Sequence, residues 1–185
     1  NVSAILGEGN GAVYDDESGW IGSLTEISLY EGYWLNVDDE DILIVIGDPV
    51  ETDISYDLHN GYNLISYPYR YFSSITDAIP EGIGCDIAAI IGEGFSAACN
   101  ESGWIGSLST LEGSYGYWFF AVEPMEITFN GCNDGQCATL SRKPQQLTTN
   151  PDGYEYSQST EQAFYFFEKI SGIKNGDWIL SFNGD

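Results

Sequence analysis

The sequence predicts a mainly β protein with two homologous β-rich lobes, followed by a C-terminal β-hairpin or partial β-sandwich. Three observations lead to this fold class. The chain has 13 Tyr, 9 Phe, 5 Trp and 22 Gly but only five Lys and Arg, a composition typical of strands and tight turns rather than long helices. One block of motifs occurs twice. Asn-Gly pairs, the strongest short hairpin signal, recur along the chain.

The duplicated block is the most specific feature of the sequence. Its centre, Glu-Ser-Gly-Trp-Ile-Gly-Ser-Leu, is identical at residues 17–24 and 101–108. An Ala-Ile-aliphatic-Gly-Glu-Gly segment precedes each centre, at 4–9 and 89–94, and a Gly-Tyr-Trp segment follows each, at 32–34 and 116–118. We therefore predict one lobe over residues 1–48 and a second lobe, with its connecting strand, over 49–131.

Each copy should form a strand, a loop, a second strand, a short helical turn and a third strand. The helical turns are expected within 23–30 and 107–114, and the third strands at Tyr33 and Tyr117. The apolar run 42–46 predicts a strand that is covered on both faces.

Between the copies, 61–68 predicts a strand that ends at a proline. Residues 73–79 predict a short helix capped by Ser73 or Ser74 and stopped by Pro80. The strand Gly-Tyr-Asn-Leu-Ile-Ser-Tyr-Pro and the motif block together resemble a tandem repeat of large secreted or surface multidomain bacterial proteins. The resemblance covers residues 1–131. It implies an extracellular, repetitive architecture and carries no catalytic activity.

Residues 132–185 should hold a disulfide loop, a linker and two strands, 163–167 and 178–182, joined near an Asn-Gly turn. This part resembles, over a shorter stretch, a secreted β-sandwich segment. Two strands alone are marginal in water. The first copy also lacks its own Asn-Leu-Ile-Ser-Tyr-Pro strand. Each end of the chain is therefore expected to fall within a module. Either the boundary of the sequence was placed there, or the absent strands come from a neighbouring polypeptide.

Four cysteines allow three pairings, of which Cys85–Cys99 and Cys132–Cys137 are the simplest. Disulfides imply an oxidising, extracellular location. The formal net charge of −24 disfavours nucleic acid and membrane partners. Carboxylate runs could instead hold a structural Ca²⁺, although none has EF-hand spacing. The candidate ligands are Asp15, Asp16, Glu17, Asp38, Asp39 and Asp41.

The aromatic residues of the two blocks have two readings. Periodic aromatics in a β-rich repeat usually belong to the core, whereas exposed ones can stack on sugar rings. The candidates for glycan binding are Trp20, Tyr33, Trp34, Trp104, Tyr117 and Trp118, and partial exposure is expected for the two tyrosines.

No catalytic constellation stands out. Glu8 and Glu93 lie in equivalent turns, which favours a shared structural role over a glycosidase pair, and His59 is isolated. We therefore expect no enzyme activity. The favoured function is a structural or adhesion module, as in a surface fibre built by strand complementation with other copies or neighbouring modules. The alternative is a polysaccharide-binding module of a secreted enzyme.

Overall fold

The computed structural model describes residues 2–39, 42–44, 52–131, 172 and 174. The chain separates into two compact units, Asn1–Ser141 and Arg142–Asp185, and every helix and strand given below belongs to the first. This part of the chain is mainly β, with antiparallel sheets and one short helix, so the predicted fold class is confirmed. The predicted C-terminal hairpin, the Cys132–Cys137 pair and Asp41 lie outside the described residues.

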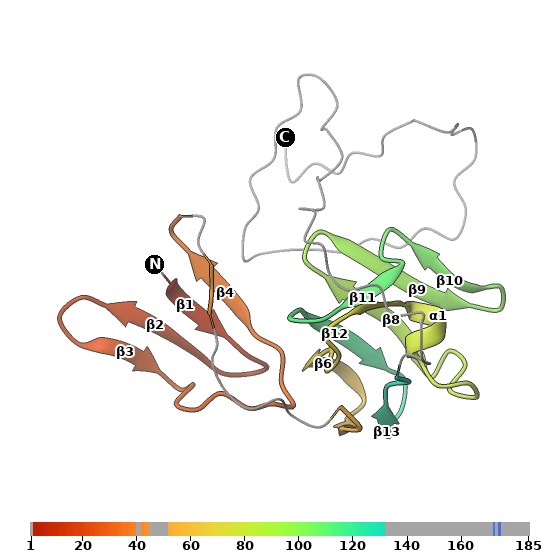
Figure 1. Ribbon diagram of the computed structural model, residues 1–185, viewed down its shortest axis with the longest axis horizontal. Coiled ribbons are helices and arrows are strands. Elements are labelled where there is room, and N and C mark those ends of the chain that lie inside the picture. The colour runs from red at the N-terminus through yellow and green to blue at the C-terminus, as the bar shows by residue number, and fades with distance from the viewer. Residues whose placement is uncertain (1, 40–41, 45–51, 132–171, 173, 175–185) are drawn as a thin grey trace. The chain divides into compact units, whose positions relative to one another are not determined.

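Lobe 1, residues 1–48, contains one four-stranded antiparallel sheet in the order β3-β2-β1-β4, shown in red and orange (Figure 1). Its strands are β1 (Val2–Leu6), β2 (Gly11–Asp15), β3 (Gly19–Gly22) and β4 (Trp34–Val37). The predicted Asn10-Gly11 turn joins β1 to β2, and the Gly7 N–H donates to the Asn10 carbonyl across it at 2.9 Å.

Lobe 2, residues 49–131, contains a five-stranded antiparallel sheet in the order β10-β9-β8-β12-β6. Its strands are β6 (Gly61–Ser66), β8 (Ile87–Gly92), β9 (Phe95–Asn100), β10 (Gly103–Gly106) and β12 (Gly116–Ala121). The strand predicted at 61–68 is therefore confirmed as β6.

Four neighbouring strands of the lobe 2 sheet repeat the pairing of the lobe 1 sheet. The order β10-β9-β8-β12 matches β3-β2-β1-β4 strand for strand. One row of paired residues runs Leu35, Ile5, Ala12, Gly22 across lobe 1, and the row Phe119, Ile90, Ala97, Gly106 crosses lobe 2. Corresponding motif residues thus hold corresponding positions. That the lobes arose by duplication stays a prediction.

The last glycine of each Gly-Trp-Ile-Gly motif is required by a close backbone approach. A Cβ on Gly22 would lie 2.1 Å from the Gly11 carbonyl oxygen, and one on Gly106 would lie 2.2 Å from that of Ser96. The φ angles are +154° and +143°, in the region that side chains rarely adopt. Both glycines therefore have the same packing role.

Lobe 2 has a second layer over its sheet. This layer consists of the two-stranded sheets β5–β13 and β7–β11 and the helix α1. Their bounds are β5 (Ser55–Leu58), β7 (Phe72–Ser74), α1 (Ile75–Ala78), β11 (Thr110–Glu112) and β13 (Met125–Thr128). The predicted helix is confirmed, and its N-cap is Ser74, whose hydroxyl accepts from the Asp77 N–H at 3.1 Å.

The core of the described residues lies between these two layers. The second layer contributes Tyr56, Leu58, Ile75, Ala78, Ile127 and Phe129, and the sheet contributes Ile65, Ile90, Ala97, Tyr117 and Phe119. Edge-to-face contacts join Phe129 to Tyr56, Tyr67 and Phe119 at centroid distances of 5.6, 5.3 and 5.5 Å. Aromatic packing of this kind stabilises a sandwich beyond the burial of its area.

Two local predictions are wrong. Residues 42–44, expected in a covered strand, lie outside any strand and are 69–76% exposed. The expected helical turns are absent from 23–30 and 107–114, and the second of these segments contains β11, which pairs with β7. Val45 and Ile46 lie outside the described residues.

The predicted disulfide Cys85–Cys99 is present, with the two Cα atoms 5.4 Å apart. It ties the segment before β8 to the middle of the β8–β9–β10 meander. Within the described ranges, no helix is long and apolar enough to cross a membrane.

Candidate functional site

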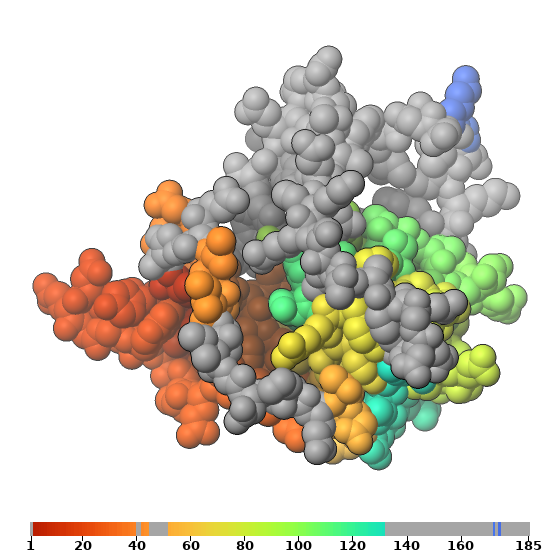
Figure 2. Space-filling view, in the orientation of Figure 1, coloured from red at the N-terminus to blue at the C-terminus, as the bar shows by residue number. Residues whose placement is uncertain are grey.

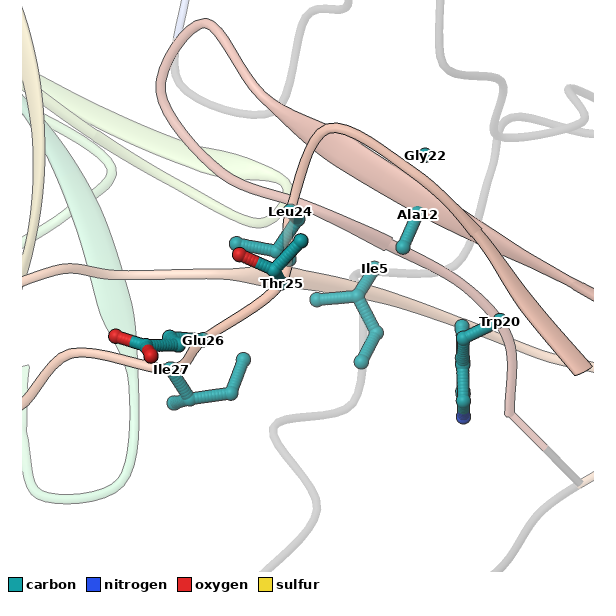
Figure 3. A pocket seen from close by; sticks show the side chains of 8 residues that line it. All are labelled: Ile5, Ala12, Trp20, Gly22, Leu24, Thr25, Glu26 and Ile27. Carbon is teal, nitrogen blue, oxygen red and sulfur yellow. The ribbon is translucent and has the colours of Figure 1, made fainter.

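The sheet of lobe 1 has an open apolar face. A shallow hollow of ≈ 420 Å³ lies on it, and Figure 3 shows the side chains that surround it. Its lining residues are Ile5, Ala12, Trp20, Gly22, Leu24, Thr25, Glu26 and Ile27. Leu35, which pairs with Ile5 and so points to the same face, extends this surface to β4. We call these residues the open face.

The open face of lobe 1 corresponds to the core of lobe 2. Ile27 is 63% exposed and Leu35 42%, whereas their counterparts Leu111 and Phe119 are 0% and 1% exposed. The other apolar lining residues Ile5, Trp20 and Leu24 correspond to Ile90, Trp104 and Leu108, which are buried in the core or packed against it. The hollow is therefore the position of a core that the described residues of lobe 1 do not complete.

The missing part can be identified by comparing the layers. In lobe 2 the sheet is extended by β6 and covered by β5, β13 and α1. Among the described residues of lobe 1, no strand pairs with the edge of β4 that corresponds to the β6-bearing edge of β12. In the space-filling view the strands β1 to β3 of lobe 1 are red, and most residues of lobe 2 range from yellow to green (Figure 2).

The aromatic residues proposed for ligand binding are not brought together in one site. Trp20 is 48% exposed beside the hollow and makes an edge-to-face contact with Tyr14, with ring centroids 5.5 Å apart. Trp34 is half-buried, and Trp104 packs against the lobe 2 core. Trp118 is half-buried beside Tyr62 at 6.5 Å. Of these four candidate tryptophans, Trp20 is the most exposed.

The two motif tyrosines share one structural contact. The Tyr33 hydroxyl accepts a hydrogen bond from the Ser28 N–H at 2.8 Å, and the Tyr117 hydroxyl accepts one from the Glu112 N–H at 2.9 Å. Each bond spans five residues and holds the loop before the last strand. Tyr117 is buried, contrary to the expected partial exposure, and this burial raises the pKa of its hydroxyl. Tyr33 is half-buried as expected.

Glu8, the acid of the first Gly-Glu-Gly turn, closes the outer edge of β6. One carboxylate oxygen accepts from the Leu64 N–H at 2.8 Å, and the other lies 2.5 Å from His59 Nε2. The Leu64 carbonyl accepts from the Gly32 N–H at 2.8 Å. Lobe 1 thus satisfies both edge-facing polar groups of Leu64. The contacts support the structural role predicted for Glu8, although its partners were not predicted.

The carboxylates proposed for calcium do not form a cluster in the described residues, where no group of three or more His, Cys, Asp or Glu side chains could hold a metal ion. Asp15 instead accepts from the N–H groups of Glu17 and Ser18 at 3.1 and 2.8 Å, and these bonds lower the pKa of its carboxyl. Asp16, Asp38 and Asp39 are exposed. A structural calcium ion stays a prediction.

Comparison with known proteins gives no relative. No family model matches the chain, and neither the curated proteins nor the solved structures contain a match. The fold and site therefore define a class by architecture alone: a β-rich, disulfide-bearing module with one completed lobe and one open lobe.

Proposed function

We propose that this chain is a non-catalytic, extracellular structural or adhesion module that assembles with other polypeptides through lobe 1. The observation that carries the proposal is the open face, an apolar surface whose equivalents in lobe 2 are buried in the core or packed against it. Exposed apolar patches on a protein this highly charged are characteristic of interaction sites.

The extracellular location is supported by the Cys85–Cys99 disulfide, since such bonds persist in oxidising compartments. The charge of −24 keeps isolated molecules apart by mutual repulsion. Assembly should therefore depend on a specific apolar contact and should strengthen as salt screens that repulsion.

Electron microscopy and sedimentation velocity of the purified native protein test this proposal. We expect ordered fibres, sheets or defined oligomers, which increase with ionic strength. Discrete monomers at every salt concentration, together with no adhesion to cells or matrix, would exclude an assembly role.

A second candidate function is polysaccharide binding, and the exposure of Trp20 beside the hollow favours it. A tryptophan ring of which 48% is exposed, with Tyr14 at its edge, can stack on a sugar ring. A glycan array and affinity electrophoresis in polysaccharide gels decide between the two candidates. Retardation that a Trp20→Ala variant loses and a Trp118→Ala variant keeps would support glycan binding, whereas no retardation by any polymer removes it.

A further inference from the structure

We propose that lobe 1 is an acceptor for a segment of three strands and a short helix with the pattern of residues 55–79, supplied by another module of the same repeat. This inference rests on the proposed assembly function and names its partner. Lobe 2 provides the template, because its own residues 55–79 form β6, which extends the equivalent sheet, and β5, β7 and α1, which belong to the layer over that sheet.

The edge of β4 fixes where the second strand of the incoming segment would lie. In lobe 2, β6 pairs antiparallel with β12, so that Ile65 lies opposite Tyr117 and Leu64 opposite Trp118. The matching positions of lobe 1 are Tyr33 and Trp34. An incoming strand in this register would continue the row of Leu35, Ile5 and Ala12 and would use the edge of β4 that no described strand occupies.

Residues 42–44 fix where the first strand would lie. In lobe 2, β5 pairs with β13. The offset of 84 residues that relates Trp34 to Trp118 also relates Gly47 to Gly131, and it maps residues 42–44 onto residues 126–128 of β13. The exposed residues Leu43 and Ile44 correspond to Ile127 and Thr128. A strand like β5 would pair with residues 42–44 and cover the hollow with counterparts of Tyr56 and Leu58.

The side chains of the incoming segment match what the hollow lacks. In lobe 2, Ile90, Ala97 and Leu111 belong to one buried cluster with Tyr56, Ile65, Ile75 and Ile79. All four belong to residues 55–79. The open face therefore has the shape and apolar character that this one segment covers.

A second copy of this chain is a poor donor on stoichiometric grounds. The Asn-Leu-Ile-Ser-Tyr-Pro strand occurs once in the sequence, whereas two sheets of the acceptor type are described. A copy that gave its segment away would expose its own lobe 2 core, so exchange between copies leaves one sheet uncovered per chain. The donor must carry an additional segment of this pattern.

The test uses the full chain and a synthetic peptide of its own residues 52–80. Because lobe 2 already holds this segment, we expect one peptide to bind per chain in isothermal titration calorimetry. Hydrogen–deuterium exchange should show new protection at 34–37 and 42–44 and no change at 116–121. A peptide with Leu58→Asp and Ile65→Asp, which places charge on the core face, should not bind.

Two chain variants provide a matched comparison. Ile27 and Ile21 are both exposed, at 63% and 54%, so aspartate at either position should leave the fold intact. The counterpart of Ile27 is fully buried, whereas that of Ile21, Ile105, is 42% exposed. Ile27→Asp should raise the Kd of the peptide about tenfold or more, because the loss of one buried apolar side chain is enough to weaken binding by that factor. Ile21→Asp should raise the Kd less than about twofold.

Several outcomes would overturn the inference: no binding of the wild-type peptide, equal loss in both variants, or protection at 116–121, which would indicate exchange into lobe 2. Self-association that Ile27→Asp abolishes, without peptide binding, would make the open face a dimer interface instead. In that case the assembly function stands and the acceptor role falls. If the chain binds the peptide but neither assembles nor adheres, the acceptor role stands and the assembly function falls.

Discussion

The backbone N–H of Leu64 donates a 2.8 Å hydrogen bond to the carboxylate of Glu8, 56 residues earlier in the chain. This contact joins the Gly-Glu-Gly turn of lobe 1 to the outer edge of β6 in lobe 2. An unpaired sheet edge exposes polar backbone groups that can recruit other strands. Glu8 and Gly32 satisfy these groups at Leu64. The outer edge of β6 is therefore hydrogen-bonded at this residue, whereas no described strand pairs with the outer edge of β4.

The first prediction concerns this edge contact. Glu8→Ala should lower the free energy of unfolding by about 1–2 kcal/mol, because the buried Leu64 N–H loses a charged acceptor. Urea unfolding followed by tyrosine and tryptophan fluorescence measures the change. Glu17→Ala, at an exposed motif position, is the control and should cost less than about 0.5 kcal/mol. Equal effects would show that Glu8 has no special role.

The second prediction concerns His59, the only histidine of the chain. The pKa of its imidazole is raised, first by the hydrogen bond to the Asn60 carbonyl and then by Glu8. Because the pKa is higher in the folded state, protonation of His59 stabilises the fold. This stabilisation is complete below the ordinary pKa of 6.5 and is lost as the pH rises through the raised pKa. Proton NMR should give one imidazole titration with its midpoint above 6.5.

Glu8→Gln separates the two causes. The variant should lower the His59 pKa only in part, because the Asn60 contact at 2.8 Å remains. The difference in Tm between wild type and Glu8→Gln should shrink as the pH rises from about 6 to about 8, where the imidazole loses its charge. A Tm difference that stays constant over this range would contradict an ion pair between the two side chains.

The third prediction concerns the motif glycines. Gly106→Ala should destabilise the protein by roughly 2–4 kcal/mol, because its Cβ would meet the Ser96 carbonyl and its φ is unfavourable for alanine. Gly103→Ala shares the positive φ but meets nothing within 4 Å, so its cost should be about 1 kcal/mol. Thermal unfolding of both variants measures the two costs, and their difference is the part due to the close contact with the Ser96 carbonyl rather than to the positive φ.

Much of the fold follows from local pattern. The repeated motifs indicate which strands correspond, and the pairing of Ile5 with Ala12 and of Ile90 with Ala97 has the same register. The helix at 75–78 follows from its Ser74 cap, and the Cys85–Cys99 pairing from its short spacing. These features depend on neighbours that are close in sequence.

The features that sequence reasoning missed depend on distant partners. An apolar run such as 42–46 indicates that burial would be favourable, but not whether anything covers it. Ile127 of β13 is buried in a cluster with Tyr56 and Leu58 of β5, a strand about seventy residues earlier, whereas residues 42–44 are 69–76% exposed. Likewise, a Gly-Glu-Gly turn does not indicate that its carboxylate reaches Leu64. The open face became visible only by comparing the two lobes.

The last prediction compares the two motif tyrosines. Tyr117→Phe removes the acceptor of the Glu112 N–H in the core, so it should cost about 1–3 kcal/mol of unfolding free energy. Tyr33→Phe removes the equivalent acceptor of the Ser28 N–H, but Tyr33 is half-buried and water can replace the hydroxyl, so the cost should be below about 1 kcal/mol.

Binding of the 52–80 peptide should change this comparison. If a donor segment completes lobe 1, Tyr33 becomes as buried as Tyr117, and the cost of Tyr33→Phe should rise toward that of Tyr117→Phe. Chemical unfolding of each variant with and without saturating peptide measures this shift. A cost for Tyr33→Phe that is the same in both conditions would mean that the peptide leaves the loop before β4 exposed, because an unfilled core keeps water next to the Ser28 N–H.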